Sequence, residues 1–163
     1  MLVFLAHREE REMKIAVASD HAGYDLKLAI IRYLREAGIS FVDFGSEAGE
    51  TVDYVDYGAK AIRKVLSGEF DRAILFCGTG LGMAIVANKF PGIIATPCWN
   101  EFTATASRTH NNSNCLCLGG RVLSEDQALA IVKIWLKSEF EGGRHERRIN
   151  KIKKLEEENF KKA

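Results

Sequence analysis

The sequence predicts an α/β fold with three layers, in which a five-stranded parallel sheet carries helices on both faces. Two observations point to this architecture. Short apolar runs alternate with longer segments of helical periodicity, and a helical segment follows each of the five apolar runs. The chain has 163 residues, of which 47% are hydrophobic, and this suits one domain with a core of its own.

The amino-terminal third predicts two strands and one helix. Lys14–Ser19 is the first apolar run. Apolar residues recur at helical spacing over Gly23–Ala37, and Gly38 ends that helix. Ser40–Phe44 predicts the second strand, and a polar loop over residues 45–51 follows it.

The middle of the chain continues the alternation. Asp53 predicts the N-cap of a helix that reaches Leu66. Arg72–Phe76 predicts the third strand, Leu81–Asn88 a short helix and Gly92–Thr96 the fourth strand.

The last third predicts one strand and three helices. Asn100–Arg108 predicts a short helix, and Asn114–Leu118 the fifth strand. Ser124–Phe140 is an amphipathic segment that Ser124 and Gln127 open as a capping box. A basic helix begins at Arg144.

We therefore expect a single Rossmann-like domain over residues 13–143. Residues 1–12 form a dispensable extension, and residues 144–163 form a C-terminal basic helix. This helix must dock on the domain or on a partner chain, because it carries an apolar seam. The seam consists of Ile149, Ile152 and Leu155.

Composition excludes several classes of function. With 23 basic and 22 acidic residues the net charge is +1, which offers no field to attract nucleic acid or an acidic membrane. No apolar run approaches the roughly 18 residues of a membrane span. The four cysteines lack zinc spacing and no secretory signal is recognisable, so we expect no metal site, no disulfide and a cytoplasmic protein. We expect three of these cysteines in the core: Cys98, Cys115 and Cys117.

Polar and glycine-rich segments follow the predicted strands. They are Ser19–Gly23, Cys77–Gly82, residues 108–112 and Gly119–Arg121. Ligands of open α/β sheets bind beyond the carboxyl ends of the strands, where the strand order reverses. We therefore expect these segments to converge on one edge of the sheet.

A glycine loop is the most specific of these segments. Gly78, Gly80 and Gly82 alternate just before a predicted helix, so backbone N–H groups can face a bound anion or a developing oxyanion. The spacing is neither the dinucleotide-binding fingerprint nor a P-loop. The alternative is a tight strand-to-helix turn that needs glycine only for its backbone.

Cys77 lies at the end of a strand, directly before that helix, where a helix N-terminus favours a thiolate. A thiolate there serves as a general base or as a nucleophile, and the alternative is a buried structural cysteine. Asp20 and His21 suit binding of substrate hydroxyls or proton transfer. Asp20 would otherwise cap the helix that follows it.

The remaining candidates are basic residues. His110, in a polar loop, suits a general acid near neutral pH, and the alternative is a solvated loop histidine. Arg144 and Arg148 share one helix face and suit a phosphate, the alternative being a solvated surface. We expect His145 on the surface of the same helix.

Together these residues resemble the ribose-5-phosphate isomerase type B family, which also includes galactose-6-phosphate isomerase subunits. The resemblance covers residues 13–160. The segments that carry it are Ser19–Gly23, Asp53–Tyr54, Cys77–Gly82, Ala87–Lys89, Ser107–Asn111, Gly119–Val122 and Glu141–His145.

The resemblance implies an enzyme that interconverts ribose 5-phosphate and ribulose 5-phosphate through an enediolate, without metal or organic cofactor. Cys77 matches the family's base and His110 its ring-opening residue, with Thr79 as a helper. The loop that matches the enediolate-binding segment consists of Gly78, Thr79, Gly80, Leu81 and Gly82. The positions that match substrate contacts, with the arginines on the phosphate, are Asp20, His21, Asn111, Arg121, Arg144 and Arg148.

The resemblance also implies a branch and an assembly. One branch of the family carries a glutamate directly after the glycine loop instead of the cysteine, and Met83 stands at that position, so this sequence resembles the cysteine branch. Family members are dimers whose active sites take residues from both chains. This implies a homodimer and leaves a tetramer open.

Three alternatives stay open. The substrate could be a six-carbon aldose phosphate, of the galactose 6-phosphate or allose 6-phosphate type, because one methylene changes discrimination only about 10–200-fold. A non-catalytic phosphate-binding module would need the glycine loop and the arginines but neither Cys77 nor His110. Cys77 could also act as a nucleophile in acyl or phosphoryl transfer.

Overall fold

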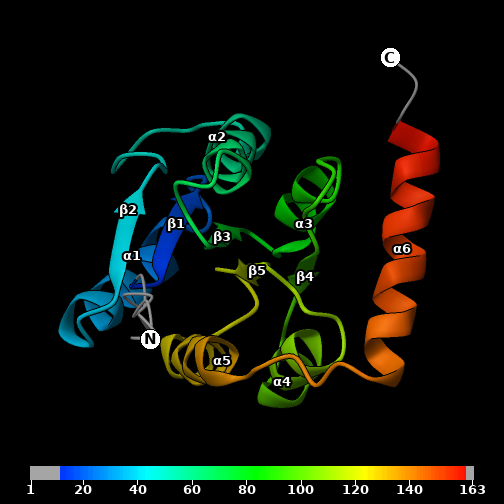
Figure 1. Ribbon diagram of the computed structural model, residues 1–163. Coiled ribbons are helices and arrows are strands. Elements are labelled where there is room, and N and C mark those ends of the chain that lie inside the picture. Colours follow the sequence, from blue (N-terminus) through cyan, green and yellow to red (C-terminus); the bar gives the residue numbers. More distant parts are fainter. Residues whose placement is uncertain (1–11, 161–163) are drawn as a thin grey trace, which may run out of the picture.

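The computed structural model describes residues 12–160 and has the predicted α/β architecture (Figure 1). Five parallel strands form one sheet in the order β2-β1-β3-β5-β4. The strands are β1 (Lys14–Ser19), β2 (Ser40–Asp43), β3 (Arg72–Cys77), β4 (Ala95–Pro97) and β5 (Cys115–Gly119). The helices are α1 (Tyr24–Glu36), α2 (Tyr54–Leu66), α3 (Leu81–Ala87), α4 (Glu101–Thr109), α5 (Glu125–Lys137) and α6 (Arg144–Phe160). The predicted extension over residues 1–12 lies outside the described residues, apart from Glu12.

Helix starts follow the capping signals of the sequence. The Asp53 side chain accepts a hydrogen bond from the Val55 amide and caps α2. Ser124 and Gln127 form the predicted capping box of α5. The end of α5 was predicted at Phe140 and is wrong by three residues, because Ser138 is already extended and its hydroxyl donates to the Ile134 carbonyl.

The sequence prediction also misplaced the fourth strand. Gly92 has a φ of 86°, and the Ile93 amide donates to the Phe90 carbonyl, so this stretch is a turn. The strand begins only at Ala95 and extends to Pro97. Proline is tolerated there because β4 is an edge strand.

The two faces of the sheet carry side chains of different size. In Figure 1, α1, α4 and α5 lie below the sheet, and α2 and α3 lie above it. The lower face presents large apolar residues from the central strands, such as Ile74, Phe76 and Leu116, packed against α1 and α5. The upper face presents mostly alanine and cysteine, which leaves room for α2 and α3 to pack close to the strands.

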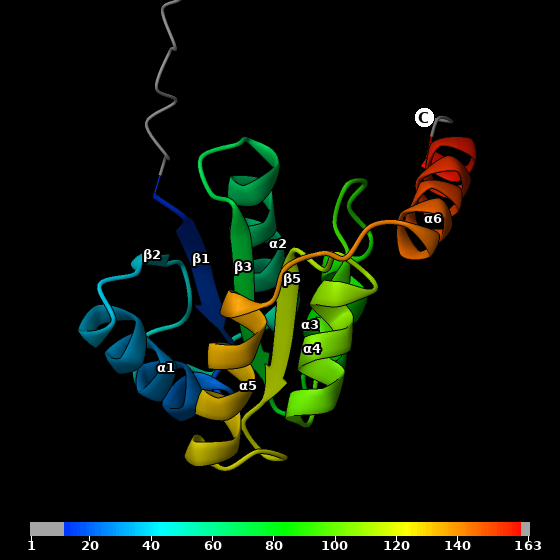
Figure 2. The ribbon, with the colours of Figure 1, turned by 60° about the horizontal axis from the view of Figure 1, so that its bottom comes forward.

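Helix α6 leaves the domain through a linker over residues 138–143. Gly142 and Gly143 both have positive φ values, 68° and 55°, which turn the chain away from α5. Figure 2 shows α6 standing apart from the sheet at the end of this linker. Only His145 and Ile149 of α6 are buried. Among the helices of residues 12–160, none combines the length and the apolar character needed to cross a membrane.

Candidate active site

The carboxyl ends of β1, β3 and β5 bring three loop segments together. The Asp20 amide donates to the Phe76 carbonyl at 3.1 Å, and the Arg121 amide donates to the Gly78 carbonyl at 2.9 Å. The strand order reverses between β1 and β3, which is where a ligand site is expected. We call the residues gathered here the carboxyl-edge cluster: Asp20, His21, Cys77, Gly78, Thr79, Gly80, Leu81, Gly82 and Arg121.

Glycine makes this convergence possible, because the loops touch through their backbones. A Cβ atom on Gly120 would lie 2.3 Å from the carbonyl oxygen of Ala22. A Cβ atom on Gly119 would lie 2.6 Å from the carbonyl carbon of Thr79. Any larger residue at either position would therefore push the loops apart.

Cys77 is the last residue of β3, and its side chain is only 4% exposed. Its Sγ accepts a hydrogen bond from the Gly80 amide at 3.2 Å. Gly80 adopts the left-handed conformation, with a φ of 81°, that folds the loop back over the sulfur. The Thr79 hydroxyl accepts from the Leu81 amide at 3.2 Å. A sulfur and several backbone N–H donors thus lie within one turn of chain.

The first two residues after β1 have different surroundings. The Asp20 carboxylate is buried and accepts a hydrogen bond from the Gly23 amide at 2.9 Å, which holds the turn before α1. His21 is exposed, and its Nδ1 lies 3.2 Å from the Val52 carbonyl oxygen. The N-cap of α1 is Gly23, without a side-chain cap bond, so Asp20 is not the helix cap, and its role in substrate binding stays a prediction.

The other three cysteines lie in the core, as predicted. Cys115 and Cys117 share one face of β5, with their sulfurs 3.9 Å apart. Burial raises the pKa of the Cys98 thiol and raises that of Cys117 well above its usual value. Both thiols therefore stay protonated at neutral pH.

His110 and Asn111 do not reach the carboxyl edge, so the prediction that all the candidate segments converge there is wrong. Helix α4 returns the chain to the amino ends of the strands, and the Asn114 amide donates to the Ile94 carbonyl just before β5 begins. A six-residue strand such as β3 spans about 17 Å, so the sheet separates His110 from Cys77 of the same chain. Segments that follow a strand lie at one edge, and segments that follow a helix lie at the other.

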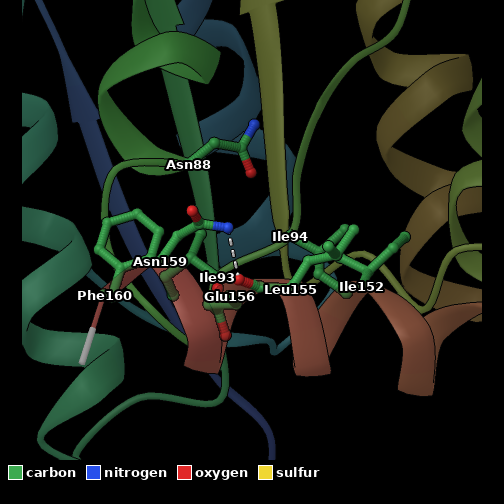
Figure 3. A pocket seen from close by; sticks show the side chains of 8 residues that line it. All are labelled: Asn88, Ile93, Ile94, Ile152, Leu155, Glu156, Asn159 and Phe160. Carbon is green, nitrogen blue, oxygen red and sulfur yellow. Dashed lines mark hydrogen bonds between the residues drawn. The ribbon is translucent and has the colours of Figure 1, made fainter. Parts of the chain in front are cut away.

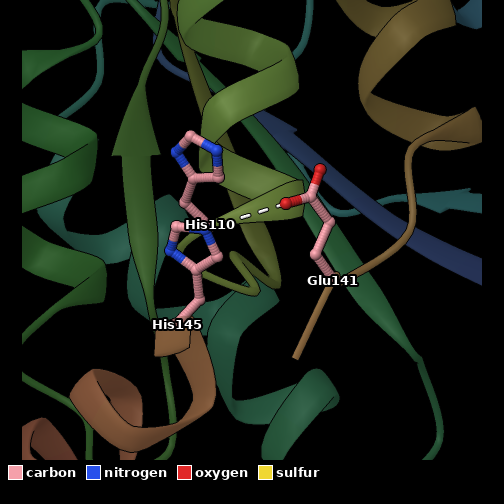
Figure 4. A group of neighbouring side chains, drawn as sticks. All are labelled: His110, Glu141 and His145. Carbon is pink, nitrogen blue, oxygen red and sulfur yellow. Dashed lines mark ion pairs between the residues drawn. The ribbon is translucent and has the colours of Figure 1, made fainter. Parts of the chain in front are cut away.

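A second group of side chains gathers around His110, and we call it the amino-edge cluster: His110, Asn111, Glu141, Arg144, His145 and Arg148. The linker from α5 passes the end of α4 here, where the Glu141 amide donates to the Thr109 carbonyl at 3.0 Å. The rings of His110 and His145 stack with centroids 4.2 Å apart and planes inclined by 8° (Figure 4). His145 is only 7% exposed, so its predicted place on the helix surface is wrong.

The charges around His145 oppose its protonation. Burial, followed by His110 and Arg144, lowers the pKa of His145, while Glu141 acts in the opposite direction. The Glu141 carboxylate lies 3.7 Å from His145 Nε2, and Arg144 Nε lies 3.4 Å from the same nitrogen. His145 is therefore neutral at neutral pH. Arg144 and Arg148 are exposed, as phosphate-binding residues of an open site would be.

Sequence analysis missed the part that Arg108 plays in holding this cluster. Its buried guanidinium donates to the Ser113 carbonyl, to Asn112 Oδ1 at 3.2 Å and to the Ser138 carbonyl at 3.4 Å. Burial lowers the pKa of Arg108 to about 10, so the residue stays charged. It joins the turn after His110 to the linker before Glu141. The sequence offered one signal of this role, because Arg108 lies on a helix face that otherwise carries small residues.

His110, Glu141 and His145 also raise the question of a metal, because three of their ligand atoms lie within 4.8 Å of one another. A histidine nitrogen binds a metal ion along a lone pair that lies in the ring plane. Two rings stacked within 8° of parallel do not aim at one common ion, and Arg144 adds a positive charge beside them. We therefore assign no metal to this cluster.

Comparison with known proteins gives consistent matches. The family model described as Ribose/Galactose Isomerase matches residues 15–152. The ribose-5-phosphate isomerase B of Escherichia coli (strain K12) is 42% identical over 144 residues, which cover 88% of this chain and 97% of the relative. A structure of ribose-5-phosphate isomerase B from Clostridium thermocellum matches with a TM-score of 0.88 and 51% identity, over 90% of this chain and 99% of the other. One from Mycoplasma genitalium with bound ribulose 5-phosphate matches with a TM-score of 0.83 and 40% identity, over 90% and 98%.

Proposed function

The chain belongs to the ribose/galactose isomerase family, and on that premise we propose that it interconverts ribose 5-phosphate and ribulose 5-phosphate through an enediolate. The observation that carries this proposal is the hydrogen bond from the Gly80 amide to Cys77 Sγ, which puts a candidate base among backbone donors. The names of the relatives support this substrate pair, as does the bound ribulose 5-phosphate of the Mycoplasma genitalium protein.

The proposed proton transfer takes place at the carboxyl edge. Cys77 removes the proton from C2 of the open-chain aldose, and the C–H electron pair becomes the C1–C2 double bond. Negative charge then develops on the carbonyl oxygen, where the N–H groups of the Gly78–Gly82 loop stabilise it. Return of the proton to C1, with a proton shift between the two oxygens, gives the ketose.

The remaining roles are divided between the two edges. We propose that His110 supplies the proton that opens the furanose ring, with Thr79 as a helper from the loop. Arg144 and Arg148 hold the phosphate, and Asn111 and Arg121 contact the sugar phosphate as well. Binding energy at the distant phosphate then positions the reacting carbons.

Since the two clusters lie at opposite edges of the sheet, we propose that a second copy of the chain completes each site. In such a homodimer Cys77 of one chain would face His110 of the other, and one substrate could contact both clusters. The argument is geometric, because the sheet of one chain keeps its own two clusters apart.

Exposed apolar surface supports the same assembly. Ile85 on α3 is 63% exposed and Phe102 on α4 is 77% exposed. Along α6, Ile152 and Leu155 line a cavity of about 440 Å³ together with Ile93 and Ile94, the two residues before β4 (Figure 3). Apolar patches on both α6 and the neighbouring helices suit a second chain that carries the same patches.

We further propose that the enzyme works in the cytoplasm. All four cysteines of the chain are free thiols, which suits a reducing compartment.

The test is turnover of ribose 5-phosphate by the purified protein in heavy water, without added metal, with Cys77→Ala alongside. We expect ribulose 5-phosphate with deuterium at C1 or C2, and a loss of kcat by roughly 10²–10⁴-fold in the variant. Wild-type protein that turns over neither this substrate nor six-carbon aldose phosphates, yet binds them, would contradict the proposal. It would then favour a phosphate-binding module.

A further inference from the structure

We infer that His145 is a positioning residue: its buried ring sets the plane of the His110 ring and couples it to the helix that carries Arg144 and Arg148. The inference rests on the proposed function, because that function gives His110 its ring-opening role. It concerns a residue that touches neither the reacting carbons nor the phosphate in the proposed mechanism.

The stacked pair is the first support. The two rings lie nearly parallel, at 8°, with centroids 4.2 Å apart (Figure 4). Within residues 12–160 no hydrogen bond holds a ring nitrogen of His110, so the stack is the contact that fixes its plane. His110 caps the end of α4, and its ring could otherwise rotate about its last torsion angle.

The second support is how firmly His145 itself is held. Its amide donates to the Gly142 carbonyl at 3.1 Å, at the start of α6. Its Nε2 lies 3.7 Å from the Glu141 carboxylate, and the Glu141 amide is bonded to the Thr109 carbonyl. The end of α4, the linker and the first turn of α6 therefore form one unit, in which His145 is the buried centre.

The charge on His145 completes the argument. The charged and titratable groups that face it are His110 from α4, Glu141 from the linker, and Arg144 and Arg148 from α6. Because burial and these neighbours lower the pKa of His145, its ring is neutral at neutral pH. A neutral ring can stack on His110 without placing a second positive charge against it when His110 carries a proton.

The chemistry of the two sugars supplies a specific test. Ribose 5-phosphate closes a furanose ring through its C4 hydroxyl, so the enzyme must open that ring before isomerisation. Ribulose 5-phosphate has its carbonyl at C2, and a furanose would need the C5 oxygen, which carries the phosphate. Net isomerisation therefore passes through the furanose ring, and a misplaced His110 should slow it by the same factor in both directions, because the equilibrium constant is fixed. Exchange of the C1 hydrogen of ribulose 5-phosphate with solvent needs only removal and return of that proton, so it should be spared.

The experiment compares isomerisation of ribose 5-phosphate with deuterium exchange at C1 of ribulose 5-phosphate in heavy water for His145→Ala, His145→Phe and His110→Asn, with Glu146→Ala as the matched control on the exposed face of the same turn. We expect His145→Ala to lower kcat/KM for isomerisation by roughly 10–100-fold and the rate of C1 exchange by less than about 3-fold. His145→Phe keeps an aromatic plane and should restore most of the lost rate. Circular dichroism and the elution volume check that each variant is folded and assembled.

Equal losses of isomerisation and C1 exchange for His145→Ala would show a merely structural role and overturn the inference. Failure of His145→Phe to recover isomerisation would also overturn it, because the ring plane would then not matter. If His110→Asn slows isomerisation and spares exchange but His145→Ala does not, the inference fails while the proposed function stands. If His110→Asn slows isomerisation and exchange alike, the ring-opening role itself fails and the inference falls with it.

Discussion

The two clusters at the edges of the sheet are held together in different ways. The carboxyl-edge cluster is fixed by backbone contacts, since β3 and β5 pair up to Cys77 and Gly119, and Gly120 touches the backbone of Ala22. The amino-edge cluster is fixed by side chains, chiefly the His110–His145 stack and the hydrogen bonds of Arg108. Formation of the sheet completes the first cluster, whereas the second depends on contacts that one substitution can remove.

This difference fits the chemistry proposed for each edge. Donors that stabilise an enediolate must be in place before charge develops, and backbone groups between paired strands meet that need. The roles in ring opening and phosphate binding are instead proposed for His110, at the end of α4, and for the arginines of α6. In a dimer, the amino-edge cluster of one chain would meet the carboxyl-edge cluster of the other. Each site would then combine a cluster fixed by backbone contacts with one fixed by side chains.

The largest expected effect comes from mixing two variants that each damage one edge. Cys77→Ala and His110→Asn should each be nearly inactive on ribose 5-phosphate. When the two chains are co-expressed and pair at random, half of the dimers are mixed and contain one intact site. Activity should then recover to about one quarter of that of wild type. No recovery above the parent variants would show that each site is built from a single chain.

The next effect should follow from blocking assembly without touching either cluster. Ile85→Glu places a carboxylate on an exposed apolar position of α3, and an interface with twofold symmetry would bury it twice. We expect a monomer by light scattering, unchanged circular dichroism and a loss of activity on the order of 100-fold. Val42→Glu, on the edge strand β2 at the far end of the sheet, is the matched control. An active dimeric Ile85→Glu variant would remove α3 from the interface.

A smaller effect is expected from disturbing the backbone of the carboxyl-edge cluster. Gly120→Ala forces a Cβ against the Ala22 carbonyl oxygen and should lower the free energy of unfolding by about 1–3 kcal/mol, with loss of activity. Gly49→Ala is the comparison, because Gly49 has a positive φ, 78°, and no atoms crowd its Cβ position, whereas Gly120 is crowded and has no positive φ. Urea denaturation at one protein concentration measures both. A Gly120→Ala variant as stable as the wild type would contradict the crowding argument.

The smallest effect is the pH dependence of the amino-edge cluster. The pKa of His145 is lower in the folded chain than in the unfolded chain, so the unfolded state binds its proton first as the pH falls. The free energy of unfolding should therefore decrease below about pH 6.5, the ordinary histidine value. Denaturation at pH 8 and pH 5.5 should show a weaker decrease in His145→Phe than in the wild type. An identical decrease in both would locate the pH sensitivity elsewhere.

The sequence predicted the carboxyl-edge cluster well, because Asp20, Cys77 and Arg121 each lie at or just after the end of a strand, and the ends of parallel strands meet at one edge. The same reasoning failed for His110, because His110 follows helix α4 and not a strand. Its loop therefore lies at the amino ends of the strands, opposite the edge that we predicted. His145 was misplaced because its burial depends on a residue 35 positions away, which periodicity within α6 cannot reveal. The roles of the site residues in catalysis stay predictions.

One consequence of the core cysteines concerns reagents that attack sulfur. Burial raises the pKa of the Cys98 and Cys117 thiols, and Cys115 is fully enclosed, so these three resist alkylation while the fold is intact. Cys77 is only 4% exposed, but it lies at the end of its strand and accepts a hydrogen bond from the glycine loop that a ligand must reach. It is therefore the sulfur that a substrate-shaped electrophile should reach. One equivalent of such a label would both count and silence the active sites.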